Sequence, residues 1–475
     1  ICWSTPGRLS FAGPIAGWLL EVMGGSLSAP RQVEKLKNGT QAQQEEAAKA
    51  LGEIARDFPD RREYVALAGS VPLLVELLKK GSARLQEVAA GALSHIAMNQ
   101  TNKAKIAEAG AISPLVELLK SGSPEARGAA AAAVANLAGG CAPNQAEVAE
   151  RGGIPPLVEL TKSGTPRIKA WAAVALGNVA LQCRENQVAV GEAGGVSALI
   201  QLLAEEGEPV SEASAPALAL PRQLLAACNR RRNPASAAST RAEEPRLKEL
   251  AAKALSSLAF ECAENRRRVV EAGGLQLLLG LVRAHTGTAG LEAAKALCNI
   301  VPADTEAKTR FVEADGILVL VKSAHDAKVR DLAAALLGSI ASGSLEGRRQ
   351  IVEAGGALFF VDLLGSGSAQ GKQWAAAGLR TLAEKHPESK PHIVDAGGVQ
   401  ALVKLAGHGT PAVTVGAAKA LQALAAGDPE IEGQIRSNGG GAALDKIAKL
   451  GGMTLRSLGP EEAPEGVGNG QRQGG

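Results

Sequence analysis

The chain has 475 residues and a net charge of only +3, because 51 lysines and arginines nearly balance 48 aspartates and glutamates. Hydrophobic residues make up 46% of the sequence, whereas aromatic residues make up 2%, so a core would consist mainly of small aliphatic side chains. This composition excludes a disordered chain, and the balanced charge excludes a global attraction to nucleic acid or an anionic membrane. A prior of about 150 residues per domain would predict about three domains.

Residues 1–29 are expected to be a disordered or incomplete leader. The apolar stretch at residues 11–20 is interrupted by Pro14 and followed by Glu21, so it is too short to span a bilayer. A remnant of a secretory signal is the alternative reading of this stretch. Since no later segment has 18 uncharged apolar residues in a row, we expect a soluble chain without a membrane span.

A short signature of one or two glycines followed by an aliphatic residue recurs about every 42 residues. Its glycines include Gly69, Gly110, Gly152, Gly194, Gly273, Gly316, Gly355 and Gly397. A fixed period of this length is typical of repeat proteins, in which each unit buries its apolar face against its neighbours. The period therefore predicts one continuous solenoid over residues 30–450 instead of three domains.

Each period is predicted to contain one short helix followed by two longer ones. In the second helix of one repeat, Leu115, Leu118 and Leu119 have the i, i+3, i+4 spacing of a buried helical stripe. A glycine follows, here Gly122, and we expect it in the left-handed conformation that ends many helices. The next residue, Ser123, is expected to cap the third helix.

The third helix repeats most plainly, in nine segments. One aliphatic column holds Leu51, Leu93, Val134, Leu176, Leu255, Leu297, Leu337, Leu379 and Leu421, and a second holds Ile54, Ile96, Leu137, Val179, Leu258, Ile300, Ile340, Leu382 and Leu424. These two columns are predicted to form the core. Between them lies a column, called here the central column, with Glu53, His95, Asn136, Asn178, Ser257, Asn299, Ser339, Thr381 and Ala423. Its side chains are predicted to point away from the core.

The short helix is marked by Asn102, Asn144, Asn186 and Asn265, each leading into a Val/Ile-x-Glu pattern. Together with the Leu-x-Asn-Val-Ala ending at residues 176–180 and the Gly-Gly-aliphatic opening, this pattern resembles the armadillo repeat family over about residues 30 to 450. The resemblance implies an all-α fold, a right-handed superhelical solenoid with three helices per repeat. It also implies that the third helices line a concave groove for extended peptides.

One interval is about 37 residues too long. The excess, at residues 207–244, contains four prolines, many alanines and serines, and three consecutive arginines, which is a composition that cannot supply a packed repeat. We expect a disordered insertion between the second and third helices of one repeat, with mispredicted coding sequence as the alternative. The Gly-rich residues 451–475 are expected to be a disordered tail.

No motif for catalysis or cofactor binding is present in the sequence. Phosphate-loop, nucleophile-elbow, His-Glu-x-x-His and Cys-x-x-Cys patterns are all missing, and the six histidines do not pair at ligand spacing. Cys141, Cys183 and Cys262 recur at equivalent points of successive repeats, too far apart for disulfides. We therefore expect free thiols in a reducing compartment, no metal, no cofactor and no enzymatic activity.

The groove predicted from the resemblance contains the candidate binding residues. Asn136, Asn178 and Asn299 match the groove asparagines of the family, and an amide can both donate to and accept from a peptide backbone. The alternative is a structural bond between helices or at a helix end. Trp171 and Trp374, seven positions before the central column, could cover a ligand side chain or could fill gaps in an alanine-rich core.

The charge of the predicted groove favours an acidic ligand. Four positions before the central column, where importin-alpha-like proteins carry tryptophan, this chain has lysines that include Lys253 and Lys295. Lysines would repel a basic peptide and favour an acidic one. Glu292, three residues before Lys295, is expected to satisfy part of this charge within the helix, as is Glu46 for Lys49.

We therefore expect a non-enzymatic scaffold or adaptor, similar to cytosolic armadillo adaptors, that binds extended and preferably acidic segments of partner proteins. It is expected to be a monomer in the cytoplasm, with the nucleus as a second compartment, and to bind no nucleic acid. The alternative is the substrate-binding part of a larger protein such as a U-box ubiquitin ligase. Nuclear import ranks third, because the paired Trp and Asn of the import groove are missing.

Overall fold

The computed structural model describes residues 28–205, 247–284, 287–323 and 326–442, and within these ranges the chain forms helices and no strands. The described residues divide into an N-terminal unit, residues 28–179, and a C-terminal unit, residues 180–205 and 247–442. The insertion expected at residues 207–244 and the tail expected at 451–475 lie outside the described residues, as does nearly all of the leader.

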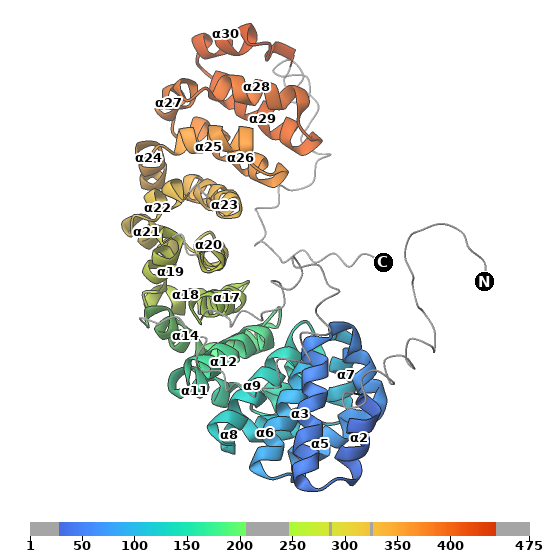
Figure 1. Ribbon diagram of the computed structural model, residues 1–475. Helices are drawn as coiled ribbons and strands as arrows, with labels where there is room; N and C mark the ends of the chain where they lie inside the picture. The colour runs from blue at the N-terminus through green and yellow to red at the C-terminus, as the bar shows by residue number, and fades with distance from the viewer. Residues whose placement is uncertain (1–27, 206–246, 285–286, 324–325, 443–475) are drawn as a thin grey trace, which may run out of the picture. The chain divides into compact units, whose positions relative to one another are not determined.

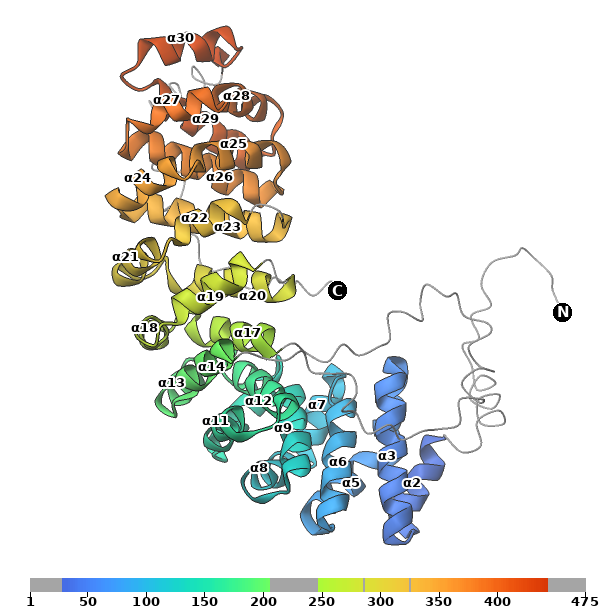
Figure 2. The same cartoon turned by 60° about the vertical axis from the view of Figure 1, so that its left-hand side comes forward.

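The N-terminal unit holds four repeats (Figure 1). The first is α2 (Ala29–Asn38) and α3 (Gln41–Asp57); the second is η1 (Pro59–Arg61), α4 (Arg62–Val65), η2 (Ala66–Ser70), α5 (Val71–Lys80) and α6 (Ala83–Ile96). The third is α7 (Gln100–Glu108), α8 (Ile112–Ser121) and α9 (Pro124–Ala138), and the fourth is α10 (Ala142–Glu150), α11 (Ile154–Ser163) and α12 (Pro166–Val179). The third helices α3, α6, α9 and α12 pack in sequence against one another (Figure 2).

Within the described residues, the C-terminal unit holds the next five repeats and one further helix. The first three are α13 (Arg184–Glu192), α14 (Gly195–Ala204) and α17 (Leu247–Ala259); α18 (Ala263–Glu271), α19 (Gly274–Arg283) and α20 (Thr288–Ile300); and α21 (Thr305–Glu313), α22 (Gly316–Lys322) and α23 (Ala327–Gly343). The last two are α24 (Leu345–Glu353), α25 (Gly356–Ser366) and α26 (Ala369–Lys385), and α27 (Ser389–Asp395), α28 (Gly398–His408) and α29 (Pro411–Ala425), followed by α30 (Pro429–Ser437). The third helices α17, α20, α23, α26 and α29 again pack in order.

The core is an aliphatic seam inside each repeat, as the two third-helix columns predicted. Every member of both columns is at most 2% exposed, and Leu115, Leu118 and Leu119 on α8 are at most 5% exposed. Small residues let the third helices approach closely: Ala92, Ala133 and Ala175 are also buried. The scarcity of aromatic residues follows from this arrangement, because a thin seam of Leu, Ile and Val fills each repeat.

The turns before the third helices depart from the prediction in one respect. Ser123 caps α9 as predicted, by accepting a hydrogen bond from the Ala126 amide at 3.2 Å. Gly122, however, is extended (φ −71°, ψ 166°), so the expected left-handed conformation was wrong. Glycine is needed there for space, since a Cβ atom would lie 2.6 Å from the Leu118 carbonyl oxygen. The left-handed glycines are instead those before the second helices, such as Gly194 (φ 80°).

Buried asparagines on the first helices α7, α10 and α18 tie their repeats to the ones before them. The Asn144 amide on α10 donates to the carbonyl oxygens of Leu137 at 3.0 Å and Lys103 at 3.4 Å, which belong to α9 and α7. Asn102 and Asn265 make the equivalent pairs of bonds in their repeats. These asparagines are at most 3% exposed, so the bonds satisfy carbonyl groups that water cannot reach.

The residues after Asn102 and Asn144 point the other way, toward their own repeats. Gln145 donates to the Asn178 carbonyl oxygen at 2.8 Å, at the C-terminal end of α12. Lys103 donates to the Gly139 carbonyl oxygen, the C-cap of α9. In both cases the side chain satisfies a terminal carbonyl of the third helix, which has no partner within that helix.

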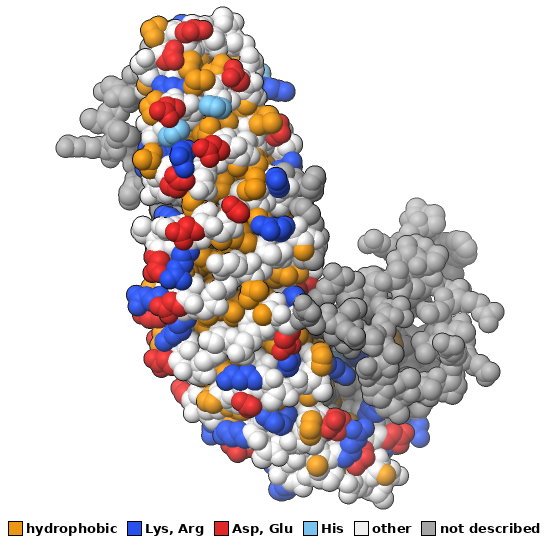
Figure 3. All heavy atoms as spheres, turned by 90° about the vertical axis from the view of Figure 1, so that its left-hand side faces the viewer, with side chains coloured by type: hydrophobic (Ala, Val, Ile, Leu, Met, Phe, Trp, Pro, Cys, Tyr) orange, Lys and Arg blue, Asp and Glu red, His pale blue; other side chains and the backbone are white. Residues whose placement is uncertain are grey.

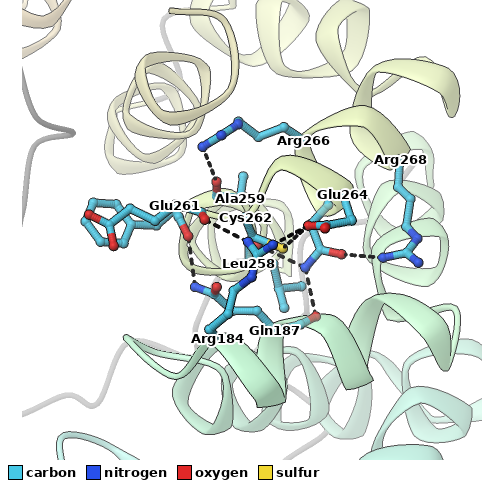
Figure 4. Close-up of polar contacts among 11 residues, drawn as sticks. Arg184, Gln187, Leu258, Ala259, Glu261, Cys262, Glu264, Arg266 and Arg268 are labelled. Carbon is cyan, nitrogen blue, oxygen red and sulfur yellow. Dashed lines mark hydrogen bonds and ion pairs between the residues drawn. The ribbon is translucent and has the colours of Figure 1, made fainter. Parts of the chain in front are cut away.

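The same arrangement joins the helices on either side of residues 206–246 (Figure 4). Gln187 on α13 donates to the carbonyl oxygens of Ser257 and Phe260, both at 3.0 Å. Arg184 donates to the Glu261 carbonyl oxygen at 2.7 Å and pairs with the Glu264 carboxylate at 2.5 Å. Helices α13, α14 and α17 therefore form one regular repeat, with the long interval between its second and third helices.

No single described helix is long and apolar enough to cross a membrane. The pair α13 and α14 passes the test of length and composition only when joined, and it is bent by 69°.

Candidate binding surface on the third helices

The candidate surface is the side of the third helices that the central column occupies, called here the third-helix face. On α12 it contains Trp171 and Asn178, which are seven residues apart and therefore lie on one side of the helix. Both side chains are half-buried, between fully buried neighbours. The surface is built from side chains at the rim of the aliphatic seam.

The three predicted groove asparagines each bond the preceding third helix of their own unit. Asn136 donates to the Ser94 carbonyl oxygen at 2.9 Å, and Asn178 donates to the Ala135 carbonyl oxygen at 2.8 Å. These asparagines therefore do make a structural bond between helices. A primary amide has a second proton and a carbonyl oxygen, so this bond leaves Asn136 and Asn178 with hydrogen-bonding groups for a ligand.

Asn299 differs from the other two asparagines. Its amide nitrogen contacts both the carbonyl oxygen of Ser256, at 3.1 Å, and the hydroxyl oxygen of the same residue, at 3.0 Å. Its Oδ1 atom is buried and has no hydrogen-bond partner within the described residues. Asn299 therefore has less to offer a ligand than Asn136 or Asn178.

The two tryptophans lie at equivalent positions of different units. Trp171 on α12 and Trp374 on α26 are both half-buried. A side chain that only filled a gap in the core would be enclosed, as Phe360 is at 0% exposure. Part of each indole ring thus remains available on the third-helix face, where it could cover an apolar or cationic group.

The two candidate lysines differ in their surroundings. Lys253 on α17 is exposed, whereas Lys295 on α20 is half-buried and pairs with Glu292 at 2.8 Å, as expected from their spacing. Glu46 was expected to pair with Lys49 within α3. Its carboxylate instead lies 3.5 Å from Lys35 on α2. Lys253 is therefore the clearer source of positive charge.

The third helices of the two units differ in net charge. Those of the N-terminal unit balance Lys49, Arg56, Arg84, Arg127, Arg167 and Lys169 against Glu45, Glu46, Glu53, Asp57, Glu87 and Glu125. Those of the C-terminal unit carry Lys248, Lys253, Lys295, Lys328, Arg330, Lys372, Arg380, Lys385 and Lys419 against Glu249, Glu292, Asp331 and Glu384. Positive charge is thus in excess only in the C-terminal unit.

Comparisons with known proteins support the repeat assignment. The family model described as armadillo/beta-catenin-like repeat matches residues 58–98 and 99–139. A crystal structure of an engineered protein is similar over 88% of this chain and 93% of its own length, with 32% identity and a TM-score of 0.75. The chain belongs to the armadillo repeat family. A second engineered protein matches 57% of the chain over 96% of its own length, with 29% identity and a TM-score of 0.47. A designed armadillo repeat protein also matches 57% of the chain, over 100% of its own length, with 26% identity and a TM-score of 0.46. A comparison with curated proteins finds no match.

In the central column of this armadillo protein, His95 holds the position that Asn136 and Asn178 hold in the next two repeats. Burial, reinforced by the positive charges of Arg56, Arg62 and Arg167, lowers the pKa of His95 to about 4. Its Nδ1 atom is buried without a hydrogen-bond partner within the described residues. The imidazole is therefore neutral at pH 7, and it adds no charge to the third-helix face.

The remaining reactive side chains form no candidate metal centre within the described ranges. No group of three or more His, Cys, Asp or Glu residues is placed to hold a metal ion there. Cys141, Cys183, Cys262 and Cys298 are free thiols, and full burial raises the pKa of Cys298 to about 12, which keeps that thiol protonated. The first-helix side shows charges of both signs interspersed (Figure 3), many of them paired, such as Arg310 with Glu306 at 2.6 Å.

Proposed function

We propose that this armadillo protein is a non-enzymatic scaffold whose third-helix face binds extended segments of partner proteins. The observation that carries the proposal is the half-buried Trp171 on the same side of α12 as Asn178, whose amide has groups left for a ligand. An indole covers a ligand side chain, and an amide bonds the peptide unit beside it. Asn136 and Trp374 would contribute in the same way, and Asn299 less.

Acidic segments are the ligands that the C-terminal unit favours. Its third helices carry an excess of positive charge, and Lys253 is exposed. Complementary charge increases the rate of association and discriminates against basic segments, although an exposed pair adds little affinity by itself. Lys295 would contribute less than Lys253, because Glu292 already pairs with it. We further propose that the chain acts as a monomer in the reducing cytoplasm.

Fluorescence anisotropy with labelled 12-residue peptides would test this function. The probes would be one peptide rich in Glu and Leu, a matched peptide with Lys in place of Glu, and a Gly/Ser peptide. We expect the full chain to bind the acidic peptide best. Trp171→Ala should weaken this binding by about tenfold or more, which corresponds to about 1.4 kcal/mol.

The matched control for Trp171→Ala is Leu345→Ala, which removes a 67% exposed side chain from α24, outside the third-helix face. It should leave binding unchanged. Lys253→Glu should weaken the acidic peptide and strengthen the basic one. Equal affinities for all three peptides, or equal loss from Trp171→Ala and Leu345→Ala, would show that the third-helix face is not the binding surface.

A further inference from the structure

An open pocket of about 640 Å³ lies between the second helix α19 and the first helix α21 of the next repeat, within the C-terminal unit. On α19 it is lined by four residues at helical spacing: Gln276, Leu279, Gly280 and Arg283. At the end of α21 and in the turn that follows, it is lined by Arg310, Glu313, Ala314 and Asp315. None of these residues belongs to a third helix, so the pocket is separate from the third-helix face.

Gly280 is the residue that opens this pocket. It is exposed, and a Cβ atom at this position would meet no heavy atom within 4 Å. The other second helices carry a polar or charged side chain at the equivalent position: Glu76, Glu117, Glu159, Gln201, Lys322, Asp362 and Lys404. Glycine also weakens a helix relative to these residues. Neither close packing nor helix formation therefore explains why glycine is found here.

Asp315 departs from the repeat pattern on the α21 side of the same pocket. Its backbone is left-handed, with φ 55°. In the other repeats the equivalent residue is a glycine with positive φ: Gly69, Gly110, Gly152, Gly194, Gly273, Gly355 and Gly397. A side chain in this conformation costs stability that glycine avoids. Two unusual residues thus line one pocket, which is typical of a functional site on a regular framework.

The charges of the pocket lining do not cancel. Arg310 pairs with Glu306 at 2.6 Å, so its charge is already satisfied. Arg283, Glu313 and Asp315 are exposed and have no ion pair within the described residues. Two carboxylates and one guanidinium group are therefore left, with an excess of one negative charge. This excess favours a basic ligand.

We propose that this pocket, called here the α19 pocket, binds an arginine side chain of a partner protein. Glu313 and Asp315 lie at the C-terminal end of α21, where the helix dipole also favours a cation. A guanidinium group has donors for two carboxylates at once, which an ammonium group does not offer in a fixed geometry. The aliphatic stem of the arginine would pack against Leu279 in the space that Gly280 leaves.

An exposed leucine near the pocket extends the expected ligand. Leu318 lies one turn after Asp315 on α22, which packs against α19, and it is 39% exposed. The equivalent residues of α19 and α28 are polar, Gln276 and Gln400. We expect an aliphatic residue beside the partner's arginine to cover Leu318. The α19 pocket and the third-helix face thus favour ligands of opposite charge.

Fluorescence anisotropy of the full chain would test this proposal with a labelled peptide that contains Leu-Arg between glycines. The matched probe has citrulline, an uncharged isostere, in place of arginine. We expect the arginine peptide to bind about tenfold more tightly or better. Methyl NMR should show that the Leu279 resonances shift when it binds.

Two variants introduce residue types found in other repeats, so each should fold at least as well as the unmodified chain. Gly280→Gln fills the α19 pocket, and Asp315→Gly removes a carboxylate together with the left-handed side chain. Each should weaken binding of the arginine peptide by about tenfold without lowering the Tm. The control is Gly433→Gln on α30, where a Cβ atom also has open space, and it should leave binding unchanged.

Equal affinities for the arginine and citrulline peptides would overturn the proposal, as would full affinity in both Gly280→Gln and Asp315→Gly. Loss of the arginine peptide with Trp171→Ala would also overturn it, because that result would assign the binding to the third-helix face. Binding of the acidic peptide is measured separately and is expected to be unchanged by Gly280→Gln. The proposal for the α19 pocket and the proposed function can therefore fail independently.

Discussion

The N-terminal and C-terminal units build the same repeat but connect their third helices differently. In the N-terminal unit, Asn136 and Asn178 each donate to a carbonyl oxygen of the preceding third helix. In the described central column of the C-terminal unit, Asn299 makes such a bond, whereas Thr381 donates to the Ala377 carbonyl oxygen within its own helix. Ala423, at the end of the series, has no side-chain donor.

This difference shows which parts of the repeat determine the fold. Both units have the same buried aliphatic columns and stack in the same way, so the seam is sufficient for packing. The central column can therefore vary without loss of the fold, and it differs in bonding and in neighbouring charge between the units. Repeat proteins place their binding residues on such variable positions of a constant framework.

The largest effect should come from the seam, and it should be equal in the two units. Leu176→Ala and Leu379→Ala each empty a fully buried position, which should cost about 2–5 kcal/mol. Local opening free energies from hydrogen exchange would measure the cost in each unit separately. A much smaller loss in one unit would show that its seam is looser and would break the equivalence.

The next effect concerns the buried asparagines of the first helices. Asn144→Ala in the N-terminal unit and Asn265→Ala in the C-terminal unit would each leave two buried carbonyl oxygens without this donor. We expect a loss of about 2–3 kcal/mol in each, by urea unfolding followed by exchange. The exposed Asn38→Ala on α2 is the control and should cost much less.

The titration of His95 should produce a pH effect in the N-terminal unit. Because the pKa of His95 is lowered to about 4 in the folded state, the unfolded state binds a proton first as the pH falls below about 6.5. Stability from His95 is therefore complete above pH 7 and is lost toward pH 4, by about 2 kcal/mol at pH 5. His95→Asn, which copies the later repeats, should remove this part of the pH dependence measured by urea unfolding.

The smallest effect tests the difference between the units directly. Asn178→Ala removes a bond between helices and should cost about 1 kcal/mol, whereas Thr381→Ala removes a bond within one helix and should cost about 0.5 kcal/mol or less. Differential scanning calorimetry of both variants would compare them. Equal losses would mean that the asparagine bond contributes nothing beyond local helix stability.

Periodicity predicted the repeat and its core because both depend on residues that are near in sequence. The spacing of Leu115, Leu118 and Leu119 shows a helix face, and recurrence of Leu176 and its equivalents shows that the face is shared. The conformation of Gly122 could not be predicted in this way. Glycine is required there because the Leu118 carbonyl oxygen leaves no room for a Cβ atom. A glycine in the sequence does not show whether it is required for space or for a left-handed conformation.

The candidate surface was predicted less completely than the fold. Spacing within one helix correctly predicted the pair of Lys295 with Glu292, but not the contact of Glu46 with Lys35 on a neighbouring helix. The recurrence of Asn144 and its equivalents was visible, yet its bonds end on carbonyl groups of another repeat. A sequence shows that such an amide is placed regularly, and only the packed structure shows which groups it meets.

The paired directions of Asn144 and Gln145 have a mechanical consequence. One side chain holds the preceding repeat and the next holds the end of α12 in its own repeat, so tension along a unit would pass through both bonds in series. If the Asn144 bond to the preceding repeat broke, the Gln145 bond would still hold the third helix α12 to the first helix α10. Under a steady pull, each unit should therefore lengthen in steps of one whole repeat, with elasticity set by the number of repeats rather than by single helices.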